Sequence, residues 1–157
     1  MPRYLVLQGP NLNLLGGREP AIYGSRSLTE LHDDLDLWAR SRGCELEFLQ
    51  SNHEGELVDA LQSAAERVDG VVFNPGGYSH TSVALRDCIA GIDLPVVEVH
   101  LSNLHAREAW RQGSLTGAVS RGVIGGFGEE GYRLAILQLA GLVAAEDAPT
   151  ERQRKRT

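Results

Sequence analysis

The sequence predicts a single α/β domain built around one parallel sheet. Short apolar runs alternate with longer amphipathic stretches, which is the pattern of successive βαβ units. The length of 157 residues fits one domain. Hydrophobic residues make up 42% of the chain and charged residues 23%, as in other globular proteins, so the chain has the apolar side chains that a buried core needs.

Five apolar runs are the expected strands, and four amphipathic stretches are the expected helices. The strands are expected at 4–7, 46–49, 71–73, 96–99 and 123–124. The helices are expected at 27–42, 54–68, 81–90 and 132–144. Five parallel strands joined by helices predict a flavodoxin-like three-layer sandwich, with helices on both faces of the sheet. The helix at 27–42 has marked ends, because Ser27 and Glu30 form a capping box and Gly43 supplies a stop.

The two ends of the chain carry no targeting or membrane signal. The apolar run at 4–7 is too short for a signal peptide, and no run approaches the length of a membrane span. We therefore expect a cytoplasmic protein without a membrane partner. Residues 146–157 are polar and charged with no apolar period, so we expect a disordered tail after a single domain at 1–145.

Charge and cysteine content exclude two further classes of function. The formal net charge of −6 argues against a nucleic-acid partner, because binding to phosphate backbones needs a positive face. Cys44 and Cys88 lack the spacing of metal ligands, so no metal site is expected. We interpret both cysteines as small buried hydrophobes.

Polar residues gather directly after three of the expected strands. Asn11 follows the first strand, Asn74 and His80 follow the third, and His100 follows the fourth. Because ligands of such sheets bind beyond the carboxyl ends of the strands, these side chains are expected to line one site. Each also has a purely structural interpretation, since Asn is common in turns and His80 can cap a helix together with Thr81 and Ser82. Their gathering at one edge favours the site.

The connection at 9–26 is long and has little secondary structure of its own, which is typical of a functional loop. It carries Arg18 and Tyr23. A free Tyr has a pKa of about 10 and is a poor base at neutral pH, but a nearby guanidinium lowers that pKa. The pair is a candidate general base. Taken singly, Tyr23 is better explained as an anchor for the loop and Arg18 as an ion-pair partner of Glu19.

The segment after the fourth strand offers an anion site. A short polar helix is expected at 106–112, and the free backbone N–H groups of Leu101 and Ser102 before it suit a carboxylate. Arg111 brings a fixed cation near the far end of the same segment.

Asp87 lies seven residues after His80, on the same face of the expected third helix. At ~1.5 Å per residue the two are about 10 Å apart along the helix axis, which is far for one small ligand. Asp87 is therefore expected either to serve the site of a neighbouring subunit or to make a surface salt bridge.

Several motifs, matching in order and spacing, together resemble one known family. They are Gly9-Pro10-Asn11-Leu12-Asn13-Leu14-Leu15-Gly16, Arg18-Glu19-Pro20-x-x-Tyr23-Gly24, Gln50-Ser51-Asn52-His53-Glu54-Gly55, Asn74-Pro75-Gly76-Gly77-x-x-His80-Thr81-Ser82 and Glu98-Val99-His100-Leu101-Ser102-Asn103-x-His105-x-Arg107-Glu108. The chain from about position 4 to about position 143 resembles the type II 3-dehydroquinate dehydratases.

The resemblance implies a fold, a reaction and an assembly. The family has a flavodoxin-like fold and uses no metal or cofactor. Its members remove water from 3-dehydroquinate by an anti elimination through an enolate, giving 3-dehydroshikimate in the shikimate or quinate pathway. They assemble as homododecamers, each a tetramer of trimers. By resemblance, the domain at 1–145 is a catalytic domain.

The resemblance also implies a role for each candidate residue. Tyr23 would be the base and Arg18 would hold it ionised, while Asn11 would stabilise the enolate and His100 would protonate the departing hydroxyl. The substrate-binding roles would fall to Asn74, His80 and Arg111 on the hydroxyls, to the Leu101 and Ser102 amides on the carboxylate, and to Asp87 in a neighbour's site. Two positions depart from the family: Gln8 stands where Asn is usual, and the stretch 112–116 is unlike the usual sequence.

Proteins of the same fold class without catalytic activity are the alternatives. A flavin-binding flavodoxin needs a short phosphate loop rich in Ser and Thr after the first strand, whereas this loop is long and carries Asn, Leu and Arg. A signalling domain of the response-regulator type needs an Asp after the third strand, where Asn74 stands. A serine hydrolase, which would be an alternative with catalytic activity, is disfavoured because the chain has no G-x-S-x-G motif.

Overall fold

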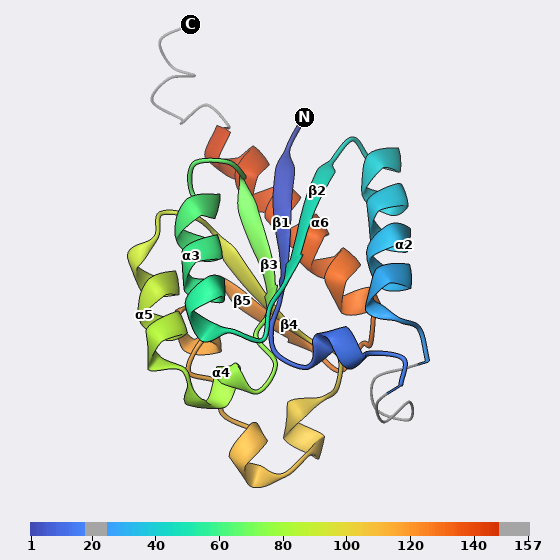
Figure 1. The fold of residues 1–157 in the computed structure, drawn as a ribbon. Helices are drawn as coiled ribbons and strands as arrows, with labels where there is room; N and C mark the ends of the chain where they lie inside the picture. Colours follow the sequence, from blue (N-terminus) through green and yellow to red (C-terminus); the bar gives the residue numbers. More distant parts are fainter. Residues whose placement is uncertain (18–24, 148–157) are drawn as a thin grey trace, which may run out of the picture.

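The computed structural model describes residues 1–17 and 25–147. Five parallel strands form one sheet in the order β2-β1-β3-β4-β5 (Figure 1). They are β1 (Arg3–Gln8), β2 (Glu45–Gln50), β3 (Gly70–Asn74), β4 (Val96–His100) and β5 (Gly122–Gly125). The fold class is therefore confirmed, and each strand contains the apolar run that predicted it.

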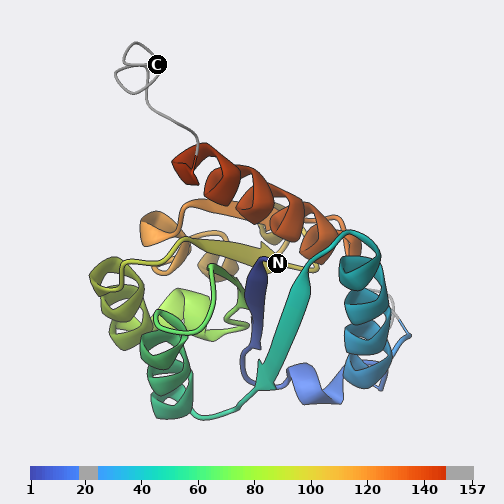
Figure 2. The same cartoon turned by 90° about the horizontal axis from the view of Figure 1, so that it is seen from above.

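Helices cover both faces of the sheet and complete the three layers (Figure 2). One face carries α2 (Leu28–Ser41) and α6 (Glu130–Asp147), and the other carries α3 (Glu54–Ala64) and α5 (Val83–Gly91). The alternation of side chains along β1 divides the core in two, because Tyr4 and Val6 pack with α2 and α6 while Leu5 and Leu7 pack with α3 and α5.

The sequence signals at the ends of α2 are confirmed. The Ser27 hydroxyl accepts the backbone N–H of Glu30 at 3.1 Å, which satisfies one of the free donors of the first turn. Gly43 follows the helix with a φ of 76°, a left-handed conformation that glycine adopts without strain. Leu31 and Leu35 are buried on the inner face.

The third expected helix, at 81–90, is present as α5 but is wrong at its start, which lies two positions later at Val83. The chain forms a short α4 (Tyr78–Thr81), breaks at Ser82, and resumes as α5. Ser82 has extended backbone angles, and its buried hydroxyl accepts the N–H of Leu85 at 2.9 Å. The side-chain cap therefore sets the start of α5, and of the three candidate caps His80, Thr81 and Ser82 it is Ser82 that caps it. His80 lies in α4, so His80 and Asp87 do not share one helix as expected.

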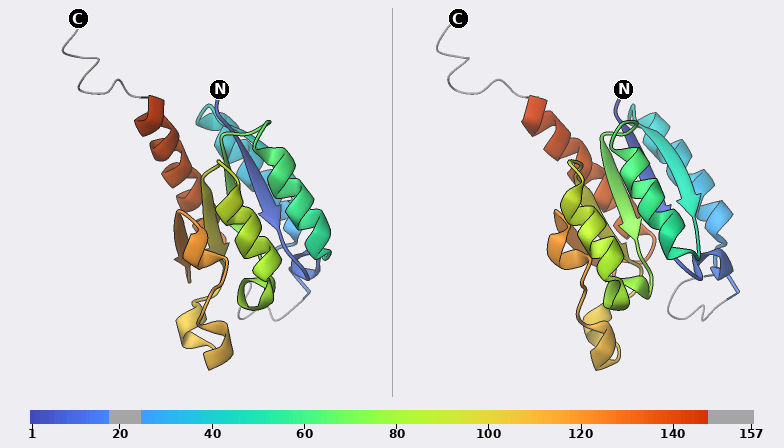
Figure 3. Two further views of the ribbon diagram at one scale, coloured as in Figure 1. Left: turned by 90° about the vertical axis from the view of Figure 1, so that its left-hand side faces the viewer. Right: turned by 60° about the vertical axis from the view of Figure 1, so that its left-hand side comes forward.

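The expected polar helix at 106–112 is also wrong. The segment forms two 3-10 helices, η2 (Leu104–Ala106) and η3 (Ala109–Arg111), because Arg107 between them is extended. A third 3-10 helix, η4 (Gly117–Val119), precedes β5. The segment with η2 and η3 projects beyond the carboxyl edge of the sheet (Figure 3).

The largest differences from the expected boundaries are at the ends of α3 and α6. Helix α3 ends at Ala64 rather than at position 68. Helix α6 continues to Asp147, so positions 146 and 147 belong to this helix and not to the expected tail. The rest of the expected tail lies outside the described residues. Within 1–17 and 25–147, no helix is long and apolar enough to cross a membrane.

The loops that follow β1 and β3 approach each other closely, and two glycines allow it. A Cβ atom on Gly9 would lie 2.5 Å from the Pro75 carbonyl oxygen. Gly76 has a φ of 57°, and a Cβ there would lie 3.1 Å from the Pro10 carbonyl oxygen. Glycine is required where backbones come this close, and the contact brings Asn11 and Asn74 to one edge of the sheet.

Candidate active site

A cavity of about 140 Å³ lies beyond the carboxyl ends of β1, β3 and β4. Its wall contains the predicted residues Asn11, Asn74, His80, His100, Leu101, Ser102 and Arg111. The clustering predicted from the strand ends is therefore confirmed for these residues. Arg18 and Tyr23 lie outside the described residues. Asp87 lies elsewhere, exposed on α5, with its carboxylate 2.9 Å from the Arg86 guanidinium.

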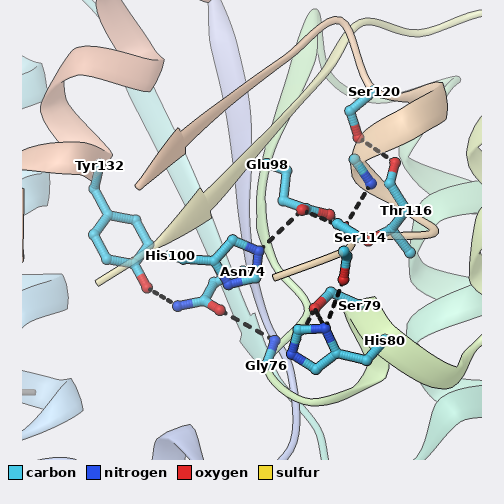
Figure 4. A network of polar contacts seen from close by, with 12 residues as sticks. Asn74, Gly76, Ser79, His80, Glu98, His100, Ser114, Thr116, Ser120 and Tyr132 are labelled. Carbon is cyan, nitrogen blue, oxygen red and sulfur yellow. Dashed lines mark hydrogen bonds and ion pairs between the residues drawn. The ribbon is translucent and has the colours of Figure 1, made fainter. Parts of the chain in front are cut away.

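His100 is the most enclosed titratable side chain of the cavity wall. It ends β4, is 5% exposed, and its Nε2 lies 2.9 Å from a carboxylate oxygen of Glu98 (Figure 4). The two residues are separated by one position on β4 and therefore point to the same face of the sheet. An ionised carboxylate can only accept, so Nε2 carries the hydrogen of this bond.

Glu98 is fully buried and held by two hydroxyl groups. Ser114 Oγ donates to Oε2 at 2.7 Å, and Thr116 Oγ1 donates to Oε1. Burial raises the pKa of the Glu98 carboxyl, but the hydrogen bond and charge of His100 and the two hydroxyl donors outweigh it, so the pKa is lowered from its usual value. The buried carboxylate is therefore kept ionised and can stabilise positive charge on the His100 ring.

Asn74 ends the neighbouring strand β3 and is fixed by two hydrogen bonds. Its Oδ1 accepts the N–H of Gly76 at 3.1 Å, and its Nδ2 donates to the Tyr132 hydroxyl at 2.9 Å (Figure 4). The bond to Gly76 is the turn role that Asn commonly has after a strand. The turn interpretation is thus confirmed, and the same amide also lines the cavity.

His80 is oriented by the segment that departs from the family pattern. Its Nδ1 lies 2.8 Å from the Gly113 carbonyl oxygen, which can only accept. Nδ1 therefore carries a hydrogen, and Nε2 is the remaining polar atom of the ring. The ring edge also meets Trp110, with the centroids 6.0 Å apart.

Two arginines from the projecting segment supply positive charge to the cavity. The Arg111 guanidinium stacks over the Trp110 ring at 4.1 Å and pairs with the Glu108 carboxylate at 3.0 Å. Arg107 also lines the cavity and approaches the Ser102 hydroxyl at 3.4 Å. A cavity with these cations and several amide and imidazole donors suits a small anion that carries hydroxyl groups.

Asn11 has a left-handed backbone conformation, which is uncommon outside glycine but tolerated by Asn. Its φ is 68°, the left-handed region, and it begins the 3-10 helix η1 (Leu12–Leu14). The Asn52 side chain accepts the Asn11 backbone N–H at 2.9 Å. A held, strained turn of this kind is frequent at functional sites, and it leaves the Asn11 side chain at the cavity.

Glu98, Arg107, Ser114 and Thr116 are functional candidates that received no role from the sequence. Glu98 had a signal, because a charged residue inside an apolar strand needs a partner. Arg107 stood in one of the quoted motifs. The two hydroxyl residues carried no signal of their own, since their contact with Glu98 joins different segments of the chain.

No ligation site for a metal emerges from these residues. Among the residues that the structure describes, no three His, Cys, Asp or Glu side chains are grouped as a metal ion would require. The polar groups at the cavity are instead amides, imidazoles and guanidinium groups.

Comparisons with known proteins identify the family. The profile of the family described as Dehydroquinase class II matches residues 2–140. This chain belongs to that family. It is 58% identical over 139 residues to a 3-dehydroquinate dehydratase of Bacillus pumilus, covering 88% of this chain and 95% of that protein. It is 57% identical over 136 residues to that of Bacillus licheniformis, covering 87% and 94%.

A solved structure agrees with this assignment. The crystal structure of the type II dehydroquinase from Butyrivibrio crossotus superposes with a TM-score of 0.87 at 42% identity, covering 88% of this chain and 97% of that one. The resemblance read from the motifs is therefore confirmed. Membership of an enzyme family disfavours the flavin-binding and signalling alternatives.

Proposed function

We propose that this chain is a type II 3-dehydroquinate dehydratase of the shikimate pathway, a hydro-lyase that converts 3-dehydroquinate to 3-dehydroshikimate. The observation that carries the proposal is the cavity at the sheet edge, where His100, backed by the Glu98 carboxylate, faces Asn11, Asn74 and His80 in a chain of the class II family. The substrate is a small hydroxylated carboxylate, and the cavity offers the cations and donors that such an anion needs.

The first step is removal of a proton from the carbon next to the ketone. Tyr23 takes this proton as the phenolate, and Arg18 holds Tyr23 ionised. Asn11 stabilises the negative charge that develops on the ketone oxygen. The charge on this oxygen changes more than that on any other substrate atom in this step. These roles follow from the match of Arg18, Tyr23 and Asn11 to the family motifs.

The second step is loss of the hydroxyl group. His100 gives it a proton, so that water leaves, and the enolate collapses to the conjugated ketone. Because Nε2 is engaged by Glu98 at 2.9 Å, Nδ1 is the ring atom that delivers the proton. The Glu98 carboxylate stabilises the charged ring that makes this donation possible, as the carboxylate does in Ser-His-Asp triads.

The remaining residues hold the substrate. Asn74, His80 and Arg111 bind its hydroxyl groups, and the backbone N–H groups of Leu101 and Ser102 bind its carboxylate. Asp87 is too far round α5 to line the cavity of its own chain and serves the site of a neighbouring subunit. This role agrees with assembly as a homododecamer of four trimers. The proposed enzyme acts in the cytoplasm and without a cofactor.

Turnover by metal-stripped protein tests the proposal. Purified wild-type chain is mixed with 3-dehydroquinate, and the ultraviolet absorbance of the conjugated product is followed with and without a chelator. The proposal expects an equal rise in both samples and a rise at least about 10²-fold slower with Tyr23→Phe. No rise with folded wild-type protein, or full activity in Tyr23→Phe, would refute the function or the base, respectively.

A further inference from the structure

A buried chain of polar groups runs from the cavity wall into the layer between the sheet and its helices. Asn74 Nδ2 donates to the Tyr132 hydroxyl at 2.9 Å, and that hydroxyl donates to Gln8 Oε1 at 2.7 Å. Gln8 Nε2 lies 3.3 Å from Nε2 of His32. None of Gln8, Tyr132 and His32 lines the cavity, so the proposed reaction leaves this costly burial of polar groups unexplained.

The backbone brings these residues together. Gln8 and Asn74 are register partners at the carboxyl ends of β1 and β3, and they point to the same face of the sheet as Tyr4 and Val6. Tyr132, in the first turns of α6, packs on that face. Gln8 and Tyr132 are fully buried, and Asn74 is 3% exposed.

The chain of hydrogen bonds has one consistent direction. Asn74 Oδ1 accepts from Gly76, so its amide nitrogen must face Tyr132. The Tyr132 oxygen accepts this bond and therefore gives its own hydrogen to the Gln8 oxygen, which turns the Gln8 nitrogen toward His32. Burial raises the pKa of Tyr132 to about 12, which keeps the phenol a donor.

His32 ends the chain as an acceptor. Its ring stacks on Phe48 with the centroids 4.3 Å apart. Burial lowers its pKa to about 4, so the ring is neutral near pH 7 and Nε2 can accept from Gln8. Each amide in the chain thus has a single favourable orientation.

We propose that Tyr132, oriented by Gln8, is a positioning residue that fixes the Asn74 amide for substrate binding. Without the Tyr132 hydroxyl, the Asn74 amide keeps only its bond to Gly76 and is free to rotate away from the cavity. The kinetic part of this inference rests on the proposed function; the positioning itself does not.

Tyr132→Phe removes only the hydroxyl group and keeps the packed ring. Tyr4→Phe is the matched control, because Tyr4 is also fully buried and its hydroxyl, among the described residues, has no hydrogen-bond partner. We expect kcat/KM for 3-dehydroquinate to fall about tenfold in Tyr132→Phe, the size of one hydrogen bond, mainly through a higher KM. Tyr4→Phe is expected to keep the wild-type value.

A double-mutant cycle separates positioning from general destabilisation. If Tyr132 acts through Asn74, Tyr132→Phe lowers kcat/KM by less than about twofold in an Asn74→Ala background. The same loss in both backgrounds would overturn the proposal, because the hydroxyl would then act by another route. No loss from Tyr132→Phe in the otherwise wild-type chain would overturn it as well.

Crystal structures keep this test independent of the proposed reaction. If wild-type protein does not turn over 3-dehydroquinate, the proposed function fails, and the structure of Tyr132→Phe decides the positioning claim. A displaced or multiply oriented Asn74 side chain in Tyr132→Phe, with wild-type geometry in Tyr4→Phe, supports the claim. An Asn74 side chain in its wild-type place in Tyr132→Phe refutes it.

Discussion

At the residue scale, His100 is held by Glu98, and Glu98 is held by hydroxyl groups from a later segment of the chain. The presence of His100 at the sheet edge could be predicted, because it ends an apolar strand. The importance of Glu98 could also be predicted, because it is a charged residue between two valines of a buried strand. The contacts of Ser114 and Thr116 were not, since they depend on how the stretch 112–116 folds back over β4.

Glu98→Gln tests the role given to this carboxylate. The substitution keeps the size of the side chain but removes the charge that stabilises a protonated His100, so kcat is expected to fall about 10²-fold or more. Glu47→Gln is the control, because Glu47 also lies in the sheet and pairs with Arg67 at 3.0 Å, away from the cavity. If both variants have the same kcat and KM as wild type, the role of Glu98 is contradicted.

His32 makes the stability of the fold depend on pH. Its pKa is lowered by burial from 6.5 to about 4. Because the folded state disfavours protonation, the contribution of His32 is fully present above pH 6.5 and is lost as the pH falls toward 4. Urea unfolding should therefore show that His32→Gln loses less free energy of unfolding between pH 7 and pH 5 than wild type does. The reason is that glutamine can accept a hydrogen bond but does not titrate.

The control for this measurement is His105→Gln, at an exposed position. It should retain the wild-type dependence on pH. If the pH dependence in His32→Gln were unchanged, the neutral, half-buried imidazole would not be a feature of the folded protein.

At the scale of elements, the strands and main helices followed their apolar periodicity, and the errors fell on short segments. The break at Ser82 and the two 3-10 helices around Arg107 depend on a local cap and on one extended residue, which periodicity does not report. The site itself is assembled by connections between strands. Gly9 and Gly76 decide how closely the connections after β1 and β3 approach each other.

Gly9→Ala tests that close approach. The new methyl group would meet the Pro75 carbonyl oxygen at 2.5 Å, so the loops after β1 and β3 must separate. We expect a loss of about 1–3 kcal/mol in the free energy of unfolding, as for other overpacked sites, together with a lower kcat/KM.

Gly55→Ala is the matched control, because Gly55 lies in α3 and an added Cβ would meet nothing within 4 Å. That variant should be as stable as wild type or slightly more so. Equal stabilities and activities for the two variants, measured by urea unfolding and turnover, would mean that the close approach does not matter.

At the scale of the whole molecule, two polar networks reach the same cavity from opposite faces of the sheet (Figure 4). The Asn74, Tyr132 and Gln8 chain comes from the face covered by α2 and α6. The His100 and Glu98 pair comes from the face of α3 and α5, because these side chains alternate with Val97 and Val99 along β4. The layered architecture thus holds Asn74, the proposed substrate contact, and His100, the proposed proton donor, from separate faces.

Asp87 provides a test at the scale of the assembly. If it serves a neighbour's site, Asp87→Ala and His100→Ala are each impaired when purified alone, but co-expression of the two restores part of the activity. Mixed assemblies contain sites with an intact His100 on one subunit and an intact Asp87 on the next. If the activity of the co-expressed sample only equals the average of the activities of the two separate variants, Asp87 has no role across subunits.

A cofactor-free anti elimination of water from 3-dehydroquinate determines which hydrogen leaves the carbon next to the ketone. Metal-stripped wild-type protein is given 3-dehydroquinate stereospecifically deuterated at the carbon next to the ketone, on the side opposite the departing hydroxyl. The product is analysed by mass spectrometry. Loss of this deuterium, with retention when the label is on the other side, is the predicted result. Retention of the opposite-side label, or no product from folded protein, would contradict an anti elimination of water from 3-dehydroquinate by this chain.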